Sequence, residues 1–190
     1  MSQSNFEAQA TMLEREFYGG IDRELIVQVQ EFIEQSADTP ATAFPGLSNQ
    51  KILSELHSAE ITPKTLMAFA LFPSIYVGWS DGELAEKEKD AILKAAETVG
   101  VISGSPAFGL LNSWLNKKPT DELFAAWKEF VIAVRPALSE TAFQELQDAA
   151  TTRARNVAAA AGGILGVFRI SASEEKALTD LEQVFAEALT

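Results

Sequence analysis

The 190-residue sequence predicts an all-α protein built as a multi-helix bundle. Apolar residues recur at three- and four-residue spacing in one segment after another, which is the period of an amphipathic helix. No segment alternates apolar and polar residues over a useful length, as a half-buried strand would. Hydrophobic residues make up 47% of the chain, with 12 Phe and 3 Trp, so we expect a sizeable core rather than disorder.

The chain begins with a predicted N-terminal helical hairpin over residues 1–47. Its first helix starts with Ser4 and Glu7 at the spacing of a capping box, and a double glycine ends it. Residues 36–47 contain two prolines and are predicted to be a loop. This loop separates the hairpin, as an appendage, from a main helical domain over residues 48–190, and we expect the two to form one compact unit.

Proline, glycine and capping residues mark the helices of the main domain. Pro73 interrupts its most apolar stretch, 66–79, and is expected to kink that helix or split it in two. The stretch is too short to span a bilayer, so we expect it to be a buried helix. The first predicted helix of this domain covers residues 48–58, and the second begins at Thr62-Pro63. The third follows the Asp81-Gly82 turn and ends at Gly100, and the fourth begins at Ser105-Pro106. The last three run from Pro119-Thr120 to Pro136, over residues 139–161, and from the capping box Ser171-x-x-Glu174 onward.

The acidic turn after the apolar stretch carries the candidate site. Asp-Gly is a strong turn signal, because glycine adopts positive φ at little cost. The spacing of Asp81, Gly82 and Glu88 matches the back half of a calcium-binding loop, in which a Glu six positions after the glycine supplies both its oxygens. Apolar residues stand where the first ligands of such a loop would be, so it is not an EF-hand. The turn predicts one divalent-cation site, for calcium or magnesium, with Asp81, Glu83 and Glu88 as ligands.

Helix capping explains the same acidic residues without a metal. Negative side chains in the first turn of a helix are stabilised by the helix dipole, and Glu86 and Glu88 fall in that turn. The same dipole disfavours a cation there, so only several ionised carboxylates together would hold one. The sequence leaves both interpretations open.

A weak internal repeat relates the acidic turn to the last helix. The segment Leu84–Ile92 and the segment Ile170–Leu178 share an apolar start, a Glu four residues later and an Ala-apolar pair after that. This predicts a duplicated helix-turn-helix unit. The second copy has Val167 and Phe168 in place of Asp-Gly, so we expect only the first copy to bind a cation well.

At these residues the sequence resembles the tellurite-resistance TerB-like family. The resemblance rests on the apolar helix that runs into the turn Ser80–Leu84, on Glu88 and on the repeat at 170–178, and it covers residues 48–190. It implies an all-helical pseudo-duplication, divalent-metal binding by Asp81, Glu83 and Glu88, and a role in bacterial stress responses, including tellurite resistance. The missing Asp-Gly of the second copy departs from the family pattern and argues against a two-sided acidic site.

The composition of the chain argues against several classes of function. A net charge of −12 argues against nucleic-acid binding, because contacts with phosphate groups need clustered Lys and Arg. The chain has no Cys and one His, His57, which argues against thiolate, His-rich zinc and helical di-iron sites. Neither a nucleophile elbow nor a phosphate-binding loop is present in the sequence.

We therefore predict a cytoplasmic, non-enzymatic helical binding module that acts through other proteins, without membrane insertion. The first residues have neither a basic region nor an apolar run, so no signal peptide is expected. The alternative is a metal-free protein-interaction module of unknown function, and a hydrolase is the third candidate. The oligomeric state and the identity of the partners are left open.

Overall fold

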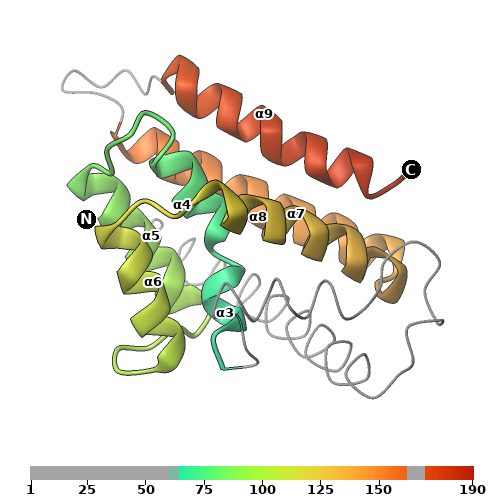
Figure 1. The fold of residues 1–190 in the computed structure, drawn as a ribbon, viewed down its shortest axis with the longest axis horizontal. Helices are drawn as coiled ribbons and strands as arrows, with labels where there is room; N and C mark the ends of the chain where they lie inside the picture. Colours follow the sequence, from blue (N-terminus) through green and yellow to red (C-terminus); the bar gives the residue numbers. More distant parts are fainter. Residues whose placement is uncertain (1–60, 62–63, 162–169) are drawn as a thin grey trace, which may run out of the picture.

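The computed structural model describes residues 61, 64–161 and 170–190, and all regular structure in these residues is helical (Figure 1). The all-α prediction is confirmed there. The predicted hairpin and the predicted helix at 48–58 lie outside the described residues. The elements are α3 (Leu66–Phe69), α4 (Phe72–Gly78), α5 (Glu86–Thr98), α6 (Pro106–Asn116), α7 (Asp121–Val134), the 3-10 turn η1 (Arg135–Ala137), α8 (Glu140–Ala161) and α9 (Ala172–Glu187).

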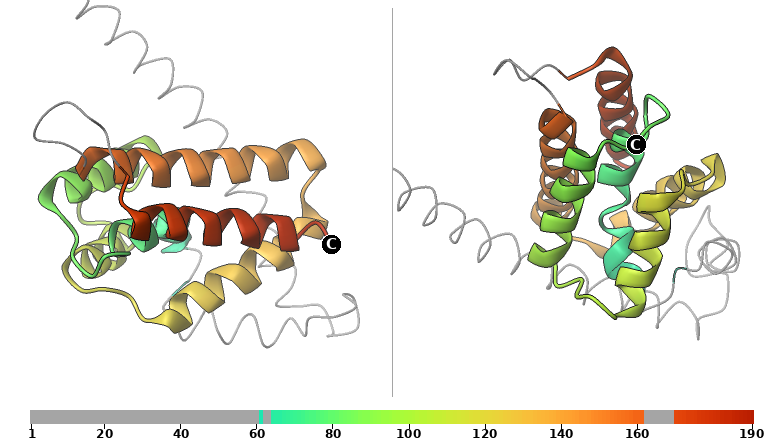
Figure 2. Two further views of the ribbon diagram at one scale, coloured as in Figure 1. Left: turned by 90° about the horizontal axis from the view of Figure 1, so that it is seen from above. Right: turned by 90° about the vertical axis from the view of Figure 1, so that its left-hand side faces the viewer.

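The short helix α4 lies at the centre of the described bundle. It packs against α8 and α9, while α5 also lies on α8 and α7 lies on α9. Figure 2 shows α8 and α9 side by side and running in opposite directions. Every residue of α4 except Tyr76 is buried, as expected of a helix that is apolar on all sides.

Pro73 separates α3 from α4, so the predicted interruption is a split into two helices. Helix α3 ends at Phe69, and α4 starts at Phe72 with the proline in its first turn. A proline is tolerated there because the first N–H groups of a helix have no intrahelical partner. The split redirects the chain so that α4 passes through the core and delivers the acidic turn.

Aromatic rings fill the core around Phe72. Its ring lies 6.1 Å from that of Phe69, 6.1 Å from Trp114 and 6.2 Å from Trp127, all as centroid distances. Trp127 and Phe185 of α9 meet edge to face at 5.7 Å. Such tilted and edge-on pairs add to the stabilisation from burial alone. Trp114 and Trp127 are both buried, so they serve core packing.

The starts of α6 and α9 carry the side-chain caps that the sequence predicts, whereas Thr120 at the start of α7 makes no side-chain cap hydrogen bond. Ser105 Oγ accepts a hydrogen bond from Phe108 N at 3.1 Å, directly before Pro106. Ser171 Oγ accepts one from Glu174 N at 3.2 Å, which confirms the predicted capping box. None of the helices in the described ranges is both long and apolar enough to cross a bilayer.

Candidate functional site

The acidic turn forms as the sequence predicts. Gly82 has a φ of 97°, and its N–H donates to Trp79 O at 3.0 Å. Asp81 Oδ1 accepts a hydrogen bond from Glu83 N at 3.0 Å, so the aspartate holds the turn by a local side-chain contact. Leu84 is buried and anchors the turn to the core.

Gly82 gives a direct test of this turn. A Cβ at Gly82 meets nothing within 4 Å, so the cost of Gly82→Ala comes from the positive φ alone. We expect a loss of about 1 kcal/mol in the free energy of unfolding, measured by urea denaturation. The matched control is Gly109→Ala, at an open position inside α6, where alanine should stabilise by about 0.5–1 kcal/mol. Equal effects of the two substitutions would contradict this conformation of the turn.

The three predicted metal ligands do not share one environment. Asp81 and Glu83 are exposed, whereas Glu88 is 4% exposed. Among the described residues, no group of three or more His, Asp or Glu side chains is placed so that it could hold a metal ion. The sequence places these carboxylates in one turn, but the fold directs only Glu88 into the interior.

Glu88 caps its own helix. Its Oε2 accepts a hydrogen bond from Ala85 N at 2.7 Å. Ala85 has no side-chain acceptor, so only this half of a capping box can form at α5. The equivalent residue of the repeat, Glu174, is 6% exposed and accepts from Ser171 N at 2.5 Å. The first turns of α5 and α9 thus each contain a buried glutamate that caps its own helix.

The two buried carboxyl groups lie next to each other. They are close enough for a protonated Glu88 to donate a hydrogen bond to Glu174. Burial raises the pKa of Glu88 to about 7, the Ala85 N–H opposes this rise, and the charges of Glu174 and Asp81 add to it. A proton on Glu88 therefore relieves the repulsion between the two groups.

Within residues 64–161 and 170–190, no basic side chain forms an ion pair with Glu88 or Glu174. Four ion pairs between described residues involve other acids, and each is at least partly exposed: Lys89–Glu86, Lys128–Glu187, Arg155–Glu182 and Lys176–Asp180. No positively charged group is among those that shift the pKa of Glu88. A buried pair of acids without a basic partner needs a proton or a bound cation to be stable.

Sequence reasoning identified Glu174 as a capping residue and a repeat position but not as a site residue. The repeat was the available signal, because it aligns Glu174 with Glu88. The duplication itself remains a prediction, although both copies show the same buried cap.

Comparisons with protein-family models, with curated proteins and with solved structures find no match for this chain. The resemblance to TerB-like proteins therefore remains a prediction from the residues of the turn and the repeat.

Proposed function

We propose that this chain is a non-enzymatic helical binding module in which Glu88 and Glu174 hold a divalent cation between the starts of α5 and α9. The observation that carries the proposal is the pair of buried carboxyl groups, Glu88 and Glu174, which have no basic partner in the part of the chain that the structure describes. Calcium and magnesium prefer such oxygen ligands.

The cation and the proton compete for the same oxygens. Below the pKa of Glu88, its proton removes one of the two negative charges, so cation binding is weak. Above it, a divalent cation relieves the repulsion that the proton otherwise removes. The positive ends of two helices oppose the cation, so we expect an affinity of about millimolar, in the range of weak calcium sites.

Thermal melting with calcium or magnesium tests the proposal. At pH 8 we expect the melting temperature of the parent to rise with added cation, by mass action on the folded state. Glu88→Gln and Glu174→Gln should both abolish the rise, and the same titration at pH 5 should give a smaller one. Glu83→Gln is the matched control, because Glu83 is an exposed acid of the same turn.

Three results would contradict the cation site. One is a parent protein that does not respond to any divalent cation at pH 8. Another is a rise that survives in Glu88→Gln. The third is a rise that disappears in Glu83→Gln but not in Glu174→Gln, which would favour the Asp81, Glu83 and Glu88 set instead.

The alternative is a metal-free interaction module, and the raised pKa of Glu88 favours it. A proton on Glu88 relieves the repulsion near pH 7 without any ion. In both cases the module is proposed to act through other proteins in the cytoplasm. The resemblance to TerB-like proteins supports a role in bacterial stress response, including tellurite resistance.

A further inference from the structure

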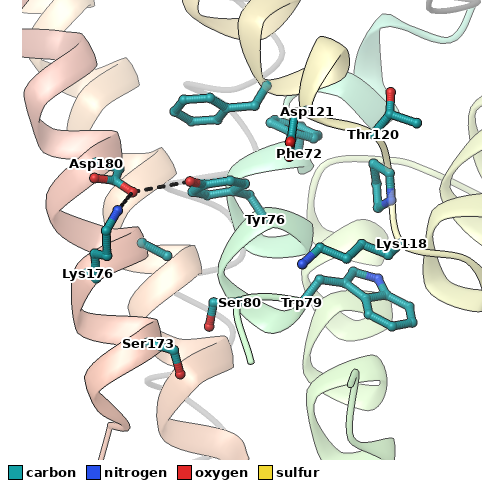
Figure 3. A pocket seen from close by; sticks show the side chains of 13 residues that line it. Phe72, Tyr76, Trp79, Ser80, Lys118, Thr120, Asp121, Ser173, Lys176 and Asp180 are labelled. Carbon is teal, nitrogen blue, oxygen red and sulfur yellow. Dashed lines mark hydrogen bonds and ion pairs between the residues drawn. The ribbon is translucent and has the colours of Figure 1, made fainter. Parts of the chain in front are cut away.

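A small pocket lies between the end of α4, the α6–α7 connection and α9. Its volume is about 200 Å³, below the roughly 300–1,000 Å³ of pockets for drug-sized ligands. Its walls are aromatic: Tyr76 and Phe124 stack with ring centroids 4.4 Å apart, and Trp79 lies opposite (Figure 3). The size and the walls suit a molecule with one planar apolar ring.

The charges in the pocket are not all satisfied. Asp180 is engaged twice, since Lys176 pairs with it at 2.7 Å and Tyr76 Oη donates to it at 3.2 Å. Lys118 has no hydrogen bond or ion pair with any described residue. Its side chain extends from the α6–α7 connection toward α4 (Figure 3). The pocket thus already contains an unpaired ammonium group, which disfavours a cationic ligand and favours an anionic one.

A second polar group in the pocket lacks a partner. Ser80 Oγ is buried and makes no hydrogen bond within the part of the chain that the structure describes. This oxygen is closed off from solvent, so the pocket offers no accessible hydroxyl at Ser80. Trp79 offers only its ring, because its Nε1 donates to Trp114 O at 2.8 Å.

We propose that this pocket binds a small aromatic carboxylate. The carboxylate is held by the Lys118 ammonium, and the ring lies against Tyr76 and Trp79. Asp121 lines the same pocket and opposes an anion, so it limits the affinity. The site is independent of the cation proposed between Glu88 and Glu174.

Ligand titration followed by NMR tests the charge and the ring separately. Benzoate is the probe, and its three controls are benzamide without the charge, benzylamine with the opposite charge and acetate without the ring. We expect benzoate to bind in the full chain at roughly millimolar concentration, as suits so small a ligand, and the controls to bind more weakly. Absence of benzoate binding at that concentration would overturn the proposal, as would equal or tighter binding of any of the three controls.

Neighbouring lysines provide a matched pair of variants. Lys118→Met is expected to weaken benzoate binding about tenfold or more, since it removes a charged hydrogen bond. Lys117→Met removes the same charge from the adjacent exposed residue, which does not line the pocket, and should leave binding unchanged. Asp121→Asn should tighten binding. Equal loss in both lysine variants would show a general charge effect and would refute the assigned contact, and melting curves establish that each variant is folded.

Discussion

Phe72→Ala is expected to lower the free energy of unfolding by about 3–5 kcal/mol, the range for a large aromatic truncated in a packed core. Phe72 is 1% exposed and contacts four other aromatic rings, on α3, α4, α6 and α7. Its removal leaves a cavity where α4 meets its neighbours, and those helices cannot close it without losing their own contacts. Because small domains are stable by only about 5–15 kcal/mol, the variant should be close to unfolding at 37 °C.

Urea denaturation followed by far-UV circular dichroism measures this effect. The matched control is Phe108→Ala in α6, since Phe108 is half-buried and makes no ring contact with any described aromatic residue. We expect its cost to be less than half as large. If the two substitutions cost the same, Phe72 is not the centre of the core.

The second large effect is a pH-dependent stability that depends on Glu88. The pKa of Glu88 is about 7 in the folded protein against an ordinary value of 4.5. Between these values the folded state binds more protons than the unfolded state, so the free energy of unfolding falls as the pH rises. At about 1.4 kcal/mol for each pKa unit, the loss from pH 4.5 to pH 8 is up to about 3 kcal/mol without divalent cations.

Glu88→Gln should remove this pH dependence. The amide keeps the shape of the side chain, accepts from Ala85 N through its oxygen and donates to Glu174 through its nitrogen. In the presence of a chelator, the variant should therefore match the parent near pH 4.5 and exceed it in stability at pH 8. Urea denaturation at a series of pH values gives the comparison.

An exposed acid of the same helix serves as the control for the pH effect. Glu86 pairs with Lys89 at 2.7 Å at the surface, so Glu86→Gln removes one negative charge, as Glu88→Gln does, but leaves the buried pair intact. Its pH profile should follow that of the parent. A Glu88→Gln profile that also follows the parent would mean that general charge repulsion, and not the buried pair, sets the pH dependence.

Local sequence signals predicted much of the described fold. The positive φ of Gly82, the starts at Ser105 and Ser171 and the break at Pro73 each depend on the chemistry of a few adjacent residues, and each is found in the structure. Such features are set by backbone sterics and local hydrogen bonds, so a short stretch of sequence contains the information.

The candidate site was harder to predict, because it depends on how distant helices meet. The spacing of the turn places Asp81, Glu83 and Glu88 near one another along the chain, but it does not determine which of them points inward. Only the packing of α5 and α9 against α4 and α8 brings Glu174 to Glu88. The pocket around Lys118 has the same origin, since three separate segments form its walls.

The central claim is that the buried carboxyl groups of Glu88 and Glu174 lie next to each other, and that a proton on Glu88 or a divalent cation relieves their repulsion. Carbon-13 NMR of the glutamate side-chain carboxyl groups, assigned through Glu88→Gln and Glu174→Gln, tests it most directly in a pH titration with and without calcium. The account predicts one buried carboxyl that titrates near pH 7, with its neighbour responding to the same step, and a shift of that step to lower pH when calcium is added. Two carboxyl groups that titrate independently below pH 5, with no response to calcium, would contradict it.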